Sequence, residues 1–246
     1  MKIKEEVVLV PTPTVPMRTV VYRPQEEGEY PAILLYSEIF QLTGPILRSA
    51  QMIAGHGFVV ACPEVYYDNL EAGTVLAYDD EGKEVGNNLK WDTPIESFDK
   101  GAQSLISFLQ KQTYCTGKIG TMGFCLGGHL AFRAALEEEV EACAIFYGTD
   151  IHSGTLGEGK NCDTFERIGE IKGEAMMVWG RQDPHVPKEG RQRIYNQMCD
   201  KEVLFSWHEF NAVHAFMRDE GDRYNPQLAH QCYGMAVDLF NRRLKI

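Results

Sequence analysis

Short apolar runs alternate along the chain with longer stretches in which apolar residues recur every three or four positions. The apolar runs lie at residues 19–22, 32–36, 58–62, 119–123, 142–147, 175–179 and 203–209, and several are continuous, as in strands covered on both faces. The stretches with helical spacing lie at 45–56, 95–111, 126–136, 188–198 and 226–244. This alternation predicts an α/β fold, with a doubly wound, mostly parallel sheet and helices on both faces. Active sites of such sheets lie at the carboxyl ends of the strands.

Two segments depart from this rhythm. Residues 64–92 are polar and acidic and follow a predicted strand, so we interpret them as an active-site loop or small cap. Residues 1–24 are interpreted as an N-terminal extension of one or two edge strands. Because 246 residues suit one large α/β domain, the whole chain, 1–246, is predicted to form a single domain.

Charge and cysteine content limit the classes of function that the chain could have. The chain has 24 Lys and Arg against 35 Asp and Glu, a formal net charge of −11, so it is a poor candidate for binding the phosphate backbone of nucleic acid. No apolar run approaches the roughly 20 residues that span a membrane, and Glu5 and Glu6 interrupt the start of the chain, unlike a secretory signal. We therefore expect a soluble, cytoplasmic protein. The seven cysteines form no C-x-x-C pair, which argues against a disulfide framework or zinc ribbon, and no metal or cofactor is expected.

The segment 123–127, Gly-Phe-Cys-Leu-Gly, lies between a predicted strand and a predicted helix. It matches the G-x-S-x-G nucleophile elbow of the α/β-hydrolase fold, with Cys125 in place of serine. The turn is crowded, so Gly123 and Gly127 fit where a larger residue would not. The helix that follows directs its amide groups and positive dipole end at Cys125, which favours a thiolate. The alternative is a glycine-rich turn with an inert, buried cysteine.

A hydrolase triad on this fold runs in the order nucleophile, acid, histidine. Asp183 follows an apolar strand, so its carboxylate is expected at the carboxyl edge of the sheet, although Asp-Pro is also common in ordinary turns. His214 follows the next predicted strand, where it could take the proton of Cys125. Three other histidines are interpreted as loop, strand and helix-packing residues, respectively: His185, His208 and His129.

These motifs resemble those of the dienelactone hydrolase family, also called carboxymethylenebutenolidases. The resemblance rests on Gly-Phe-Cys-Leu-Gly-Gly at 123–128, on Glu-Ile-Phe at 38–40, and on the acid and base regions at 180–187 and 214–218. It implies a cysteine-dependent hydrolase that cleaves a lactone or small carboxylic ester through a thioester acyl-enzyme. The catalytic residues that it implies are Cys125, Asp183, His214 and, as a fourth member that helps to deprotonate the cysteine, Glu38.

The resemblance also implies the binding groups. The backbone N–H groups of Ile39 and Leu126 would form the oxyanion hole. Arg218 would hold a carboxylate of the substrate, because a guanidinium fixed beside the base suits that role. From its position alone, Arg218 could equally be a surface residue paired with Asp219 or Glu220.

The chain departs from the family in one respect. The best-known members carry a second substrate-binding arginine before the elbow, whereas no arginine lies between Arg48 and Arg133 here. That region instead holds the acidic stretch 64–92, whose only basic residues are Lys83 and Lys90, so the sequence does not favour recognition of a small dianionic or carboxylated lactone. Trp91 is expected to wall the substrate pocket.

Two alternatives to this hydrolase remain open. The same triad could serve an acyltransferase or thioesterase, since a thioester can pass its acyl group to an amine, an alcohol or water. The chain could also be a non-catalytic binding protein that keeps a hydrolase scaffold. The expected partner is a small-molecule ester or lactone, and the protein could be a monomer or a homodimer.

Overall fold

The computed structural model describes residues 1–245. Within them one eight-stranded sheet runs in the order β1-β2-β4-β3-β5-β6-β7-β8. Strands β1 and β2 are antiparallel at one edge, and β4, β3, β5, β6, β7 and β8 are parallel. The strand bounds are β1 Ile3–Val10, β2 Met17–Pro24, β3 Tyr30–Tyr36, β4 Val59–Pro63, β5 Cys115–Phe124, β6 Val140–Phe146, β7 Glu174–Gly180 and β8 Phe205–Phe210. The predicted doubly wound, mostly parallel sheet is therefore confirmed.

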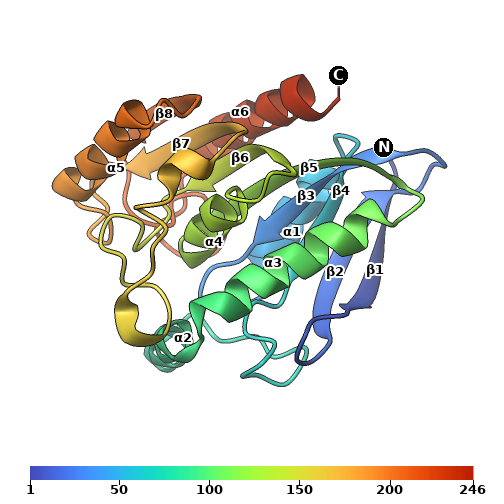
Figure 1. The fold of residues 1–246 in the computed structure, drawn as a ribbon, viewed down its shortest axis with the longest axis horizontal. Helices are drawn as coiled ribbons and strands as arrows, with labels where there is room; N and C mark the ends of the chain where they lie inside the picture. Colours follow the sequence, from blue (N-terminus) through green and yellow to red (C-terminus); the bar gives the residue numbers. More distant parts are fainter. Residues whose placement is uncertain (246) are drawn as a thin grey trace.

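Helices cover both faces of the sheet (Figure 1). Helices α1 and α6 pack on one face, and α3, α4 and α5 pack on the other, so that each face has its own apolar core. Central strands are buried throughout, because parallel strands joined by helical crossovers are covered on both sides. The helix bounds are α1 Gly44–Ala54, α2 Asp80–Asp92, α3 Ile95–Gln110, α4 Leu126–Ala134, α5 Lys188–Asp200 and α6 Pro226–Leu244, with short 3₁₀ turns at Glu158–Lys160 and Ile168–Glu170. No helix among residues 1–245 is both long and apolar enough to cross a bilayer.

Helix α2 lies apart from the two helical layers, at the end of the sheet where the parallel strands terminate (Figure 1). It belongs to the polar segment 64–92 that the sequence analysis interprets as a loop or small cap. Asp79 caps its first turn by accepting a hydrogen bond from the Gly82 N–H at 2.8 Å. Gly86 lies so close to the strand-β3 loop that a Cβ there would come within 2.6 Å of the Ile39 carbonyl oxygen. The capped helix is therefore held directly over the carboxyl edge of the sheet.

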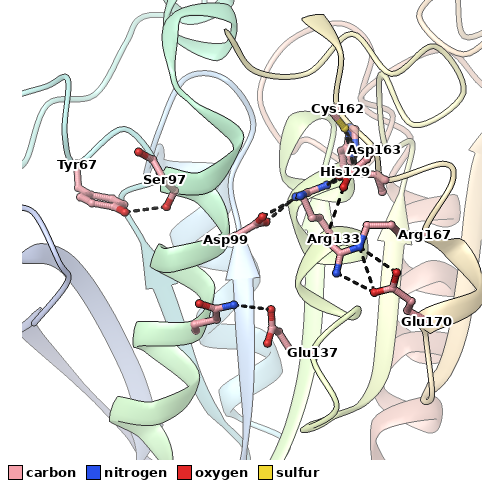
Figure 2. Close-up of polar contacts among 12 residues, drawn as sticks. Tyr67, Ser97, Asp99, His129, Arg133, Glu137, Cys162, Asp163, Arg167 and Glu170 are labelled. Atoms are coloured by element: carbon pink, nitrogen blue, oxygen red, sulfur yellow. Dashed lines mark hydrogen bonds and ion pairs between the residues drawn. The ribbon is translucent and has the colours of Figure 1, made fainter. Parts of the chain in front are cut away.

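A polar network anchors α4 on its outer side (Figure 2). The Arg133 side chain is 4% exposed and donates hydrogen bonds to Asp99 of α3 at 2.8 Å, to Asp163 at 2.6 Å and to Thr164 at 3.0 Å. One turn earlier, the His129 Nε2 lies 2.9 Å from the Thr164 Oγ1. These contacts tie α4 to α3 and to the loop between β6 and β7, so they fix the helix that follows the elbow.

Candidate active site

Cys125 occupies the sharp turn between β5 and α4 in a backbone conformation that is rare for residues other than glycine, with φ 58° and ψ −121°. Its N–H donates to the Phe146 carbonyl at 3.1 Å, and its own carbonyl accepts the Thr149 N–H at 3.2 Å. A Cβ at Gly123 would lie 1.9 Å from the Gly127 carbonyl oxygen, so the turn tolerates no side chain there. The strained turn leaves Cys125 partly exposed at the sheet edge.

His214 and Asp183 meet at the same edge, from the loops that follow β8 and β7. The His214 Nδ1 donates to the Asp183 Oδ2 at 2.6 Å, and both side chains are buried. The second oxygen of Asp183 accepts the His185 N–H at 2.8 Å, which orients the carboxylate. Burial lowers the pKa of His214, but the charge of the Cys125 sulfur, its hydrogen bond to the ring and the bond to Asp183 together raise that pKa to about 10. This environment holds a proton on the imidazole.

Glu38 follows β3 and is 3% exposed. Its Oε2 lies 3.7 Å from the Arg218 Nη1 and accepts a hydrogen bond from the Tyr78 hydroxyl at 3.3 Å. The Arg218 guanidinium also stacks over the Tyr78 ring, 4.2 Å from its centroid. Burial raises the pKa of Glu38, while the charges of Arg218 and His214 and the Tyr78 hydroxyl oppose that rise. Arg218 therefore pairs with Glu38 in the pocket. Its Nε also donates a hydrogen bond to the Glu220 carbonyl oxygen at 3.1 Å.

These side chains surround one pocket of about 370 Å³. Helix α2 and the segment before it cover the pocket. Its lining comprises Glu38, Ile39, Phe40, Tyr78, Asp79, Asp80, Lys83, Asn87, Lys90, Cys125, Thr149, Asp150, His185, His214, Ala215, Arg218, Asp222 and Arg223. The size and the convergence of polar groups at its base suit a small organic ligand.

The structure brings most of the sequence-predicted residues to this pocket. Cys125, His214, Glu38, Arg218 and Ile39 line it. Asp183 reaches the site through its bond to His214, and Leu126 follows Cys125 as the first residue of α4.

Trp91, which is predicted to line the substrate pocket, is not among the residues that line it. Instead, the Lys160 ammonium lies over its ring, 3.8 Å from the centroid. Its neighbour Lys90 points into the pocket in its place.

Several residues that line the pocket were not predicted as site residues. Tyr78 and Lys90 lie in the segment 64–92, which is predicted to be an active-site loop or small cap, and Asp150 follows the predicted strand 142–147. His185, read as an ordinary loop residue, packs its ring edge-on against His214 with the centroids 4.6 Å apart. The Asp79 capping signal three residues before Gly82 could have revealed the helix that carries Lys90. Along the described chain, no group of three or more His, Cys, Asp or Glu side chains is arranged to hold a metal ion.

Comparisons with known proteins agree with this geometry. The sequence profile described as "Dienelactone hydrolase family" matches residues 17–244 of the chain. A Saccharomyces cerevisiae protein provisionally named carboxymethylenebutenolidase is 39% identical over 241 residues, covering 94% of this chain and 88% of that protein. The carboxymethylenebutenolidase of Pseudomonas sp. strain P51 is 23% identical over 215 residues, covering 87% of this chain and 86% of the relative.

Solved structures show the same fold. A Klebsiella pneumoniae protein provisionally named dienelactone hydrolase superposes with a TM-score of 0.85 at 17% identity, covering 98% of this chain and all of that one. The dienelactone hydrolase of Anabaena variabilis superposes with a TM-score of 0.67 at 14% identity, over 99% of this chain and all of its own. The α/β-hydrolase fold is thereby confirmed. The chain belongs to the dienelactone hydrolase family and is a hydrolase of carboxylic esters or lactones.

Proposed function

We propose that this protein cleaves a lactone or small carboxylic ester by covalent catalysis, with Cys125 as nucleophile and a thioester as intermediate. The observation that carries the proposal is the arrangement of the partly exposed Cys125 sulfur and the buried His214–Asp183 pair around one pocket. A nucleophile, a base and an orienting acid in this order are the groups that acyl transfer needs.

Acylation begins with attack of the Cys125 thiolate on the substrate carbonyl carbon. The carbonyl oxygen becomes negative, and the N–H groups of Ile39 and Leu126 would stabilise it, with the positive end of α4 adding to the field. The tetrahedral intermediate then collapses, the ester C–O bond breaks, and the His214 imidazolium donates its proton to the departing alkoxide. In a lactone this oxygen stays attached to the acyl chain.

Deacylation reverses the roles. Neutral His214 removes a proton from a water molecule, which attacks the thioester carbonyl, and the Cys125 thiolate leaves as the acid product forms. Asp183 keeps the ring oriented with Nδ1–H toward the carboxylate, so that Nε2 faces the reacting atoms. The starting state returns when His214 again carries the proton.

Glu38 and Arg218 complete the proposed machinery. Glu38 would assist removal of the Cys125 proton, since burial makes its carboxyl a stronger base than a solvated one. Arg218 would bind a polar oxygen of the substrate. Its contact with Glu38 at 3.7 Å would keep the guanidinium in place before substrate arrives.

The setting of the reaction follows from the same features. A small-molecule substrate is supported by the volume of the pocket, about 370 Å³. A cytoplasmic location is supported by the seven cysteines, all of which are free thiols, because a reducing compartment preserves them.

The test compares Cys125→Ala with Cys199→Ala, which removes an exposed thiol elsewhere. Turnover of p-nitrophenyl acetate and of dihydrocoumarin, an aryl lactone, is expected to vanish in the first variant and to persist in the second. In a His214→Ala variant, acid quenching and peptide mass analysis should find the acetyl group on the peptide that contains Cys125. Full turnover by Cys125→Ala would refute the proposal.

A further inference from the structure

A buried ion pair lies in the pocket beside the nucleophile, and the proposed reaction does not use it. The Lys90 Nζ lies 3.0 Å from the Asp150 Oδ2, and the two side chains are 9% and 15% exposed. Both residues line the same pocket as Cys125. Because both side chains form part of the pocket wall, a bound molecule would contact them. The pair therefore affects which substrates fit.

The chain holds both partners in fixed positions. Asp150 has a left-handed backbone, φ 63°, directly after Thr149, whose N–H is bonded to the Cys125 carbonyl. Its second oxygen accepts a hydrogen bond from the Thr155 hydroxyl at 2.7 Å. Lys90 lies in the last turn of α2, where its carbonyl accepts the Gly157 N–H at 3.2 Å. Strain and multiple anchors at a pocket residue are typical of a functional position.

The charge of this pair is balanced inside the pocket. Lys90 faces Asp150 just as Arg218 faces Glu38, so both of these side chains, like the His214 imidazole beside Asp183, already have a carboxylate partner. A carboxylate arriving at Lys90 would meet Asp150 at similar range, and like charges in a partly buried site repel strongly. A neutral oxygen meets no such repulsion and can accept one of the remaining N–H groups of Lys90.

We propose that Lys90 and Asp150 form a subsite that accepts a neutral polar group of the substrate, such as a keto, ether or hydroxyl oxygen, and disfavours a carboxylate. This inference rests on the proposed function, because it concerns the acyl or lactone portion bound beside Cys125. The enzyme would then prefer uncharged, oxygen-bearing esters or lactones over acidic ones of the same shape.

Three methyl esters of equal chain length separate the possibilities: monomethyl succinate, methyl 4-oxopentanoate and methyl pentanoate. Their far ends carry a carboxylate, a neutral keto oxygen and no polar atom, respectively. Hydrolysis is followed by titration of the released acid at constant pH. The native enzyme should have its highest kcat/KM for methyl 4-oxopentanoate and its lowest for monomethyl succinate.

Asp150→Asn should reverse the discrimination against the carboxylate. Asparagine keeps the shape and tolerates the left-handed backbone, but it leaves Lys90 without a counter-charge. The ratio of kcat/KM for monomethyl succinate to that for methyl 4-oxopentanoate should rise about tenfold or more, as expected for unmasking one charge in a site of reduced dielectric constant. Asp238→Asn, which removes the same charge from a salt bridge on α6, should leave the ratio unchanged.

Lys90→Met gives a second, independent readout. It should abolish the preference for methyl 4-oxopentanoate over methyl pentanoate, because the donor to the keto oxygen is gone. Its own folding is checked through turnover of methyl pentanoate and through thermal unfolding.

The proposed function and the proposed subsite would be refuted by different results. If the native enzyme hydrolyses none of these esters nor p-nitrophenyl acetate, the proposed function fails. If it hydrolyses them but Asp150→Asn leaves the ratio within twofold of the native value, the subsite is refuted. A native preference for monomethyl succinate over the keto ester would refute it as well.

Discussion

Replacing Asp183 with asparagine tests the central contact of the site with almost no change in shape. The carboxylate is 4% exposed and accepts the His214 Nδ1–H at 2.6 Å. Asparagine can still accept one hydrogen bond, but it brings no negative charge. The Asp183→Asn variant should therefore fold normally and lose the electrostatic support of the imidazolium.

The size of the effect follows from the bond that is weakened. A buried hydrogen bond to a charged group contributes about 1.5–3 kcal/mol, so kcat/KM should fall about 10- to 150-fold. This loss is smaller than the roughly 10⁴-fold penalty of the corresponding change in a serine hydrolase, because cysteine hydrolases can use an amide as the orienting group.

The pH dependence has a defined sign. The Cys125 charge and the hydrogen bond and charge of Asp183 raise the pKa of His214 to about 10 against the effect of burial. The native imidazole should therefore remain protonated until the pH rises through about 10, and the alkaline limb of activity should lie there. Without the Asp183 charge the pKa of His214 falls, so the alkaline limb moves to lower pH.

The assay measures kcat/KM for p-nitrophenyl acetate from pH 5 to the highest pH at which the spontaneous rate can be subtracted. The rate of iodoacetamide alkylation of Cys125 gives a second profile that does not depend on substrate binding. Asp238→Asn controls for the change in net charge. A variant with kcat/KM within twofold of native and an unmoved alkaline limb would refute the role of Asp183.

Two further predictions concern the parts that support the site. Gly86→Ala should lower kcat/KM about tenfold or more by displacing the Ile39 backbone, which a Cβ would approach to 2.6 Å, whereas Gly234→Ala, with open space around it, should be neutral in the same assay. Arg133→Met should lower the free energy of unfolding by about 1.5–3 kcal/mol in urea titrations, since it removes charged hydrogen bonds donated by a buried guanidinium to the partly exposed Asp99 and Asp163. The exposed pair of Arg167 should contribute under about 1 kcal/mol, so an equal loss in Arg167→Met would contradict the reasoning.

The sheet and the strand–turn–helix elbow at Cys125 could be predicted because their signals are local in the sequence. Continuous apolar runs mark the buried parallel strands, and the helix at 226–244 has the bounds expected from its periodicity. For these predicted elements, the errors lie at their ends. The predicted strand 203–209 begins at Phe205 instead, because the Val203 N–H bonds back to the Met198 carbonyl and closes the end of α5. Leu204 lies between this closure and the strand, and its carbonyl accepts the Ala175 N–H of β7 at 2.9 Å.

Helix α2, which covers the pocket, could not be predicted in the same way. Helix α2 carries almost no apolar stripe, so its periodicity resembles that of a solvated loop. It forms because Asp79 caps it and because Gly86 packs on Ile39, a contact between segments far apart in the sequence. Tertiary contacts of this kind override local propensity and leave no trace in the hydrophobic pattern.

The same limit explains why composition misrepresents the pocket. A formal net charge of −11 suggests a surface that repels acidic molecules everywhere. Inside the pocket, however, Arg218 is paired with Glu38 and Lys90 with Asp150. Each pair joins residues 60 or more positions apart along the chain, so the fold alone decides which cation is neutralised by which carboxylate. Substrate choice is therefore governed by local pairing, and a single neutral substitution at Asp150 should alter it more than any change in total charge.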